Sequence, residues 1–250
     1  MNSIILTAAG VGGATVFGAV IGFIFRKSTE KLADVVISFA AGVMLATSVF
    51  NLIIPSLEIN SNFSIPVCIS GIISGSLCIT VLDFIVRLIL KEKYQSDSFF
   101  SENNKLHQIL LFVAAIAIHN LPEGIAAGVG FGTGDTAEAY MIAGSIAMQN
   151  LPEGMVVISP MLSVGISKSK TFLIAVVTGV IEIIGTLFGY YAVTISNKIL
   201  PFALSFAGGT MIYVICGDMI PGTQSDNRKQ SSTYSLITGF CLMIILNGIL

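Results

Sequence analysis

The chain alternates long apolar stretches with short polar connections. Eight stretches are each long enough, at about 20 residues, to cross a hydrocarbon core of about 30 Å as an α-helix. They lie at approximately 3–25, 32–56, 65–90, 106–131, 137–162, 170–193, 200–221 and 233–249. Each stretch is continuously apolar rather than alternating, which favours helices over barrel strands. The predicted fold is an all-α polytopic membrane protein with eight transmembrane helices, in a single domain over residues 1–250.

Composition supports this prediction. Hydrophobic residues make up 54% of the 250 positions and charged residues only 10%, whereas a soluble domain carries about a quarter charged residues. No basic patch or linker indicates a nucleic-acid partner or a second, soluble domain. The expected surroundings are therefore the lipid bilayer of the cell membrane.

Basic residues predict the orientation of the spans. Eleven of the twelve Lys and Arg residues fall in the connections after the first, third, fifth and seventh stretches, and Lys198 alone falls on the other side. Cytoplasmic loops carry the excess of Lys and Arg. Both termini are therefore expected outside the cytoplasm.

Two sequence repeats link the stretches. His119-Asn-Leu-Pro-Glu-Gly in the fourth is followed by Gln149-Asn-Leu-Pro-Glu-Gly in the fifth, and the Phe-Ala-Ala-Gly-Val-Met-Leu run from Phe39 resembles the run from Phe206. Asn51 and Asp218 lie twelve residues after those two phenylalanines. Each repeat joins spans of opposite direction, which predicts inverted three-span units, 1 to 3 and 6 to 8, around spans 4 and 5. Such symmetry is common in secondary transporters, with the site at the midplane.

The repeated motif places ligand-type side chains together. His119 and Glu123 are four residues apart and share a helix face, with Asn120 turned toward a neighbour. Gln149, Asn150 and Glu153 repeat this arrangement in the fifth stretch. Pro122 and Pro152 remove helix hydrogen bonds, so each helix can kink there.

Buried carboxylates in these stretches require a counter-charge. Glu123, Glu153 and Glu182 lie within apolar stretches, where an ionised group is costly unless it is paired, protonated or bound to a cation. No Lys or Arg is placed to neutralise them, so a metal cation is the simplest counter-charge. One imidazole with several oxygens suits zinc, iron(II), manganese or cobalt. Met44 and Met211 hold corresponding positions in the repeated runs, so either thioether can border this site, and Asn51 and Asp218 are candidates for the pathway.

These motifs resemble the ZIP family of divalent-metal transporters, and within it the prokaryotic GufA-like branch. The resemblance implies an eight-span fold with a 3+2+3 plan and a two-metal site between spans 4 and 5. In the primary site that it implies, the ligands are His119, Glu123, Gln149 and Glu153, with Met44. In the adjoining second site, they are Asn120, Asn150 and Glu182. Relatives frequently have Asp where this chain has Asn150, so the second ion would meet one negative charge fewer.

The expected function is transport of divalent transition-metal ions toward the cytoplasm, with zinc or iron(II) first and manganese, cobalt or cadmium as further substrates. The metal is cargo, up to two ions per site; no catalytic cofactor or enzyme activity is expected, and a homodimer remains open. A zinc protease would need two histidines one turn apart within the membrane, and only His119 lies there. The remaining alternatives are a structural membrane subunit and a proton- or sodium-coupled carrier of a small solute, with the glutamates as proton relays.

The charge asymmetry can be tested by cysteine labelling. In a background without the four native cysteines, Ser96→Cys should be protected from a membrane-impermeant thiol reagent in intact cells, because the third connection is expected in the cytoplasm. Cysteines added at the two termini should both be labelled. Labelling of position 96 from outside, or termini on opposite faces, contradicts the topology.

Overall fold

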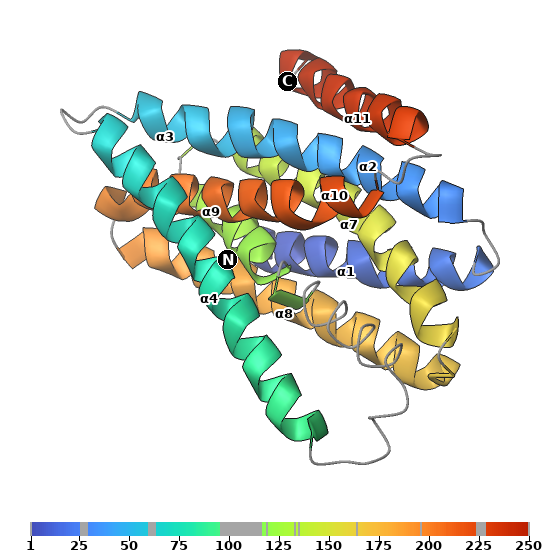
Figure 1. The fold of residues 1–250 in the computed structure, drawn as a ribbon. Coiled ribbons are helices and arrows are strands. Elements are labelled where there is room, and N and C mark those ends of the chain that lie inside the picture. Colours follow the sequence, from blue (N-terminus) through green and yellow to red (C-terminus); the bar gives the residue numbers. More distant parts are fainter. Residues whose placement is uncertain are drawn as a thin grey trace.

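The computed structural model describes residues 2–25, 30–59, 64–95, 117–118, 120–132, 134, 136–163, 165–195, 197–223 and 229–249. All regular elements in these ranges are helices (Figure 1). The long ones are α1 (Asn2–Ile24), α2 (Glu30–Ala46), α4 (Ser64–Gln95), α7 (Thr136–Ser163), α8 (Lys168–Ile195), α9 (Leu200–Val214) and α11 (Lys229–Ile249). Together with the short elements that continue α2 and α9, they occupy seven of the predicted stretches with ends that differ by only a few residues.

Shorter elements complete the described chain. The π-helical segment η1 (Thr47–Ile53) and α3 (Ile54–Glu58) continue α2, and the π-helical segment η4 (Ile215–Met219) and α10 (Ile220–Thr223) continue α9. Two 3₁₀ turns lie at Gly130–Gly132 and Asn197–Ile199. Of the fourth predicted stretch, the structure describes only 117–118 and 120–132, and residues 120–129 form an α-helix.

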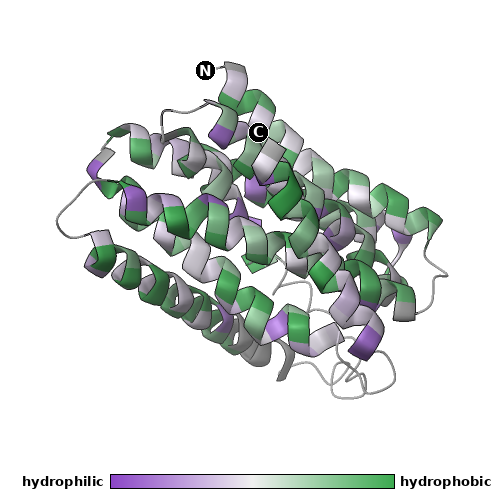
Figure 2. Cartoon of the chain, turned by 90° about the horizontal axis from the view of Figure 1, so that it is seen from above, coloured by the Kyte–Doolittle hydropathy of each residue, from purple (hydrophilic) through white to green (hydrophobic). Residues whose placement is uncertain are grey.

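The outer faces of the helices are apolar. Within the described chain, six helices are long and apolar enough to cross a membrane. On α4, Ile65, Ile69, Ile73 and Leu77 recur every fourth residue and all are exposed. Hydrophobic positions dominate the helices in Figure 2, with hydrophilic positions scattered singly. Such a surface is stable against lipid and unstable against water, so the chain is a multi-pass membrane protein.

The helices pack in preferred pairs. The α1 helix lies against α7 and α8, α4 packs on α9, and α2 packs on α11. Figure 1 shows α11 beside α2, and α4 crossing α9 obliquely. The 120–129 helix lies against α8, where Gly124 and Gly128 face the backbone of Glu182 and Thr186.

Glycines set the spacing of these pairs. A Cβ atom added to Gly18 of α1 would lie 2.2 Å from the carbonyl oxygen of Leu151 on α7, and one added to Gly42 of α2 would lie 2.0 Å from that of Leu236 on α11. Both distances are too short for any side chain, so the backbones touch. Small residues allow this close approach between membrane helices, where packing and not water exclusion drives association.

The glycine contacts recur at a constant sequence separation. Gly18 meets Leu151 in the fifth stretch, and Gly185 of α8 meets Leu121 in the fourth. Four pairs of glycines have the separation of 167 residues that also relates Phe39 to Phe206. These pairs are Gly12 and Gly179, Gly18 and Gly185, Gly22 and Gly189, and Gly42 and Gly209. Gly12 and Gly179 lie against each other. The similarity between the two parts of the chain thus extends from the sequence to the contacts.

Helix irregularities occur at two prolines outside the repeated motif. The α7 helix is α-helical on both sides of Pro152. The chain widens into π-helical turns just before Pro55 and Pro221, at η1 and η4. Proline lacks the N–H that would bond the carbonyl four residues earlier, and a wider turn re-pairs part of the backbone. Both π-helical segments hold a residue that the sequence assigns to the pathway, Asn51 and Asp218.

The close packing of α1 on α7 predicts unequal effects of two alanine substitutions. Gly18→Ala should lower the unfolding free energy by about 1–3 kcal/mol, because the new methyl group forces the backbones apart. Gly13→Ala on the same helix should leave the melting temperature unchanged, since a Cβ atom there has no neighbour within 4 Å. Thermal unfolding in detergent measures both, and equal effects would contradict the close contact.

Candidate metal-binding site

Glu182 lies where three helices converge on α8. Its carboxylate is fully buried. Thr15 of α1 donates a hydrogen bond to Oε1 over 2.7 Å, and Asn120 donates to the same oxygen. Asn150 of α7 donates to Oε2 over 2.8 Å and lies 3.3 Å from the backbone oxygen of Val11. The anion is therefore held by hydroxyl and amide donors from three directions.

The oxygens beside this junction have no such donors. Glu123 is 1% exposed, yet neither of its carboxylate oxygens has a hydrogen-bond partner among the described residues. The same holds for the side-chain oxygens of Asn120, Gln149 and Asn150 and for the side-chain nitrogen of Gln149, all completely buried. Buried polar groups in proteins are nearly always paired, because an unpaired one costs about 1–3 kcal/mol and an unpaired charge more. These oxygens form a donor set suited to a cation.

The three carboxylates lie close enough to interact. The side chains of Glu153, Glu182 and Gln149 all lie near that of Glu123. Glu153 is half-buried. Within the described chain, however, no three His, Cys, Asp or Glu side chains converge as a ready metal cluster. The donor set therefore relies on the amide oxygens as much as on the carboxylates.

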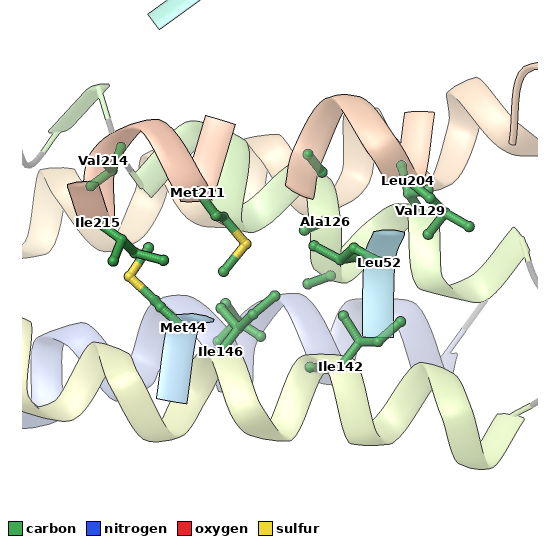
Figure 3. Close-up of a cluster of buried hydrophobic side chains, with 14 of the residues drawn as sticks. Met44, Leu52, Ala126, Val129, Ile142, Ile146, Leu204, Met211, Val214 and Ile215 are labelled. Carbon is green, nitrogen blue, oxygen red and sulfur yellow. The ribbon is translucent and has the colours of Figure 1, made fainter. Parts of the chain in front are cut away.

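Met44 lies at the apolar side of this region. It is buried in a cluster that includes Ile146 of α7, Ala126 of the 120–129 helix and Met211 of α9. Figure 3 shows Met44, Ile146 and Met211 in this cluster. Ile146 lies one helical turn before Gln149, and Ala126 one turn after Glu123. The thioether thus belongs to the apolar packing that adjoins the polar donor set.

Two predicted residues lie in the π-helical segments. Asn51 exchanges amide hydrogen bonds with Asn247 of α11, at 3.4 and 3.0 Å. Asp218 is exposed on η4. His119, the imidazole of the predicted site, lies outside the described residues, as does His107.

Three partners in these networks were not expected from the sequence: Thr15, the backbone oxygen of Val11 and Asn247. A threonine in an apolar stretch is ordinarily bonded to its own helix backbone, so composition gives no reason to single it out. One signal was present, because Thr15 lies 167 residues before Glu182, the separation that relates Phe39 to Phe206. Extending the repeat to the first and sixth stretches would have paired Thr15 with Glu182.

The described helices form a lipid-facing bundle whose interior holds buried oxygens without partners among the described residues. This defines a multi-pass membrane protein with a polar interior suited to a cation. The comparisons with known proteins agree. Residues 102–247 match the family model described as ZIP Zinc transporter. The chain belongs to the ZIP family.

Its relatives carry the same description. Zinc transporter ZIPB of Bordetella bronchiseptica is 32% identical over 249 residues, which cover 97% of this chain and 80% of that protein. Zinc transporter GufA of Myxococcus xanthus is 38% identical over 143 residues, covering 57% of this chain and 56% of that protein. Zinc transporter ZIP11 of Xenopus tropicalis is 29% identical and covers 94% of this chain and 93% of its own length. The sequence-based recognition of a GufA-like ZIP protein is confirmed.

The amide pair of Asn51 and Asn247 predicts coupled substitutions. Asn247→Ala should lower the unfolding free energy by about 1–3 kcal/mol, because it leaves the buried Asn51 amide without its partner. The Asn51→Ala, Asn247→Ala double variant should cost less than the sum of the single variants. Denaturation in mixed micelles gives the three values, and strictly additive losses would show that the pair is not coupled.

Proposed function

We propose that this chain transports zinc and related divalent transition-metal ions across the cell membrane toward the cytoplasm. The observation that carries this proposal is the completely buried set of unpaired oxygens around Glu123 and Gln149. A divalent cation supplies the charge that these oxygens lack. The relatives named as zinc transporters support zinc as the cargo.

Each residue of the repeated motif has a role in this proposal. Glu123 and Glu153 are the direct carboxylate ligands, since they are the carboxylates common to both copies of the motif. Gln149 contributes its amide oxygen beside Glu123. His119 directly precedes Asn120 in the chain and supplies the imidazole. Met44 borders the ion from the apolar side.

The ligand set tolerates several metals. An imidazole, carboxylates and amide oxygens form a borderline-to-hard set that binds zinc, iron(II), manganese or cobalt and lacks the thiolates of tight structural zinc sites. Iron(II), manganese, cobalt and cadmium are therefore proposed as secondary substrates. Weak, exchangeable binding suits a carrier, which must release its cargo on the other side.

The proposal includes an eight-span arrangement with two inverted three-span units around spans 4 and 5. It is supported by the glycine contacts that recur at a separation of 167 residues. It is also supported by the π-helical segments η1 and η4, which follow α2 and α9 at corresponding places. The excess of Lys and Arg in the loops after spans 1, 3, 5 and 7 supports an orientation with both termini outside the cytoplasm. Asn51 then lies toward the outer end of the pathway and Asp218 toward the cytoplasmic end.

Replacement of the duplicated glutamates tests the function. The Glu123→Gln, Glu153→Gln double variant keeps side-chain size but loses two negative charges, so zinc uptake into proteoliposomes at fixed protein level should fall to background. Glu58→Gln, which alters an exposed carboxylate at the end of α3, should transport like the wild type. Background-level uptake by the control, or wild-type uptake by a folded double variant, would refute the assignment.

Zinc binding separates a metal carrier from a solute carrier. Zinc at about 100 times its Kd should stabilise the wild-type protein by about 2.7 kcal/mol in thermal unfolding. The double variant should show no such stabilisation. A wild-type protein that zinc does not stabilise, but that needs both glutamates for proton-driven uptake of a small solute, would favour the solute-carrier alternative.

A further inference from the structure

Both carboxylate oxygens of Glu182 already have protein partners. Oε1 accepts from Thr15 and Asn120, and Oε2 accepts from Asn150. All three partners present hydrogen atoms to the carboxylate. These three donors occupy three of the roughly four lone-pair sites of the carboxylate. The surrounding O–H and N–H groups also present the positive ends of their dipoles to any approaching cation.

The same contacts fix the orientation of two amides. The nitrogens of Asn120 and Asn150 are turned to Glu182, so their oxygens lie on the opposite branch of each amide, where they have no partner among the described residues. Asn120 is three residues before Glu123 and Asn150 three before Glu153, so each pair shares a helix face. The free amide oxygens thus share helix faces with Glu123 and Glu153, while the Glu182 carboxylate lies on the side of the two amide nitrogens.

We propose that the transport site of this chain holds one divalent ion, and that Glu182 and Thr15 are positioning residues that orient the two amides toward it. This inference rests on the proposed function and refines it. It replaces the second ion that the family resemblance implies at Asn120, Asn150 and Glu182. The buried anion stays satisfied by hydrogen bonds whether or not cargo is present.

Asn150 determines this single occupancy. Its side-chain nitrogen donates to Glu182 and lies against the Val11 carbonyl. An aspartate at the same place has no N–H to donate and brings a second negative charge next to Glu182. Two adjacent carboxylates would repel each other, and a second cation relieves that repulsion. Asn150→Asp therefore converts the donor side of the site into a second ion site.

Thr15 acts through the Glu182 carboxylate and does not touch the ion. Its hydroxyl comes from α1, which reaches α8 because Gly12 and Gly179 lie in direct contact one turn away. Loss of the hydroxyl leaves Oε1 with one donor fewer and lets the carboxylate turn. Groups that orient ligands in this way typically change metal affinity by about 10- to 100-fold when they are removed.

Ion stoichiometry tests the proposal. Purified full-length protein is stripped with chelator, dialysed against saturating zinc, and its zinc content measured per chain. The wild type should bind one ion, Asn150→Asp two, and Glu182→Gln one at reduced affinity. Glu123→Gln should bind none over the same concentration range. Two ions on the wild-type chain, or complete loss of binding in Glu182→Gln, would overturn the proposal.

Two Thr15 variants separate positioning from packing. Thr15→Val preserves the shape but lacks the hydroxyl and should weaken zinc binding by about 10-fold, with one ion still bound at saturation. Thr15→Ser restores the donor and should return affinity to the wild-type value. Equal affinity in all three proteins would remove Thr15 from the site. A wild-type chain that binds no zinc at all would instead contradict the proposed function itself.

Discussion

The burial of carboxylates in an apolar interior is the constraint on which the rest of the structure depends. An ionised group at this depth must be paired, because lipid and packed helices offer no water. The protein meets this demand in two ways within one region. Glu182 is satisfied by three donors from the protein, whereas Glu123 is left without any among the described residues. A carboxylate with hydrogen-bond donors from the protein and a carboxylate without them therefore lie in the same region.

The network can form only because the helices approach closely. Thr15 is a short side chain, and it reaches Glu182 across an interface where the backbones of Gly12 and Gly179 touch. Gly124 similarly lies 2.2 Å, as measured from an added Cβ, from the carbonyl oxygen of Glu182 itself. Larger residues at these positions would separate the donors from the carboxylate. The glycines thus determine how close the hydrogen-bond donors lie to the Glu182 carboxylate as well as how closely the helices pack.

The sequence predicted the helices far better than the network. Apolar length alone located α1, α4, α7, α8 and α11, because the thickness of the bilayer fixes the length of a span. It did not predict the π-helical turns before Pro55 and Pro221, since a proline can be accommodated by a kink, a break or a wider turn depending on its neighbours. Thr15 was missed for a related reason: a hydroxyl gains a role only through the tertiary contact that the sequence does not display.

The repeat places different side chains at corresponding positions of its two units. The 167-residue separation takes Thr15 to Glu182 and Asn51 to Asp218. Gly75 of α4 contacts Phe206, and Gly239 of α11 contacts Phe39, the residue that corresponds to Phe206. These two glycines are 164 residues apart, so the same separation pairs Asp83 of α4 with Asn247 of α11. The amide pair thus joins η1 and α11, while the corresponding positions on η4 and α4 carry aspartates. Two similar halves with identical chemistry would attract a cation equally at both ends of a pathway. Neutral amides in one half and carboxylates at the corresponding positions of the other make the two halves electrostatically unequal. In the proposed orientation, which rests on the basic residues of the loops, the acidic positions lie toward the cytoplasm.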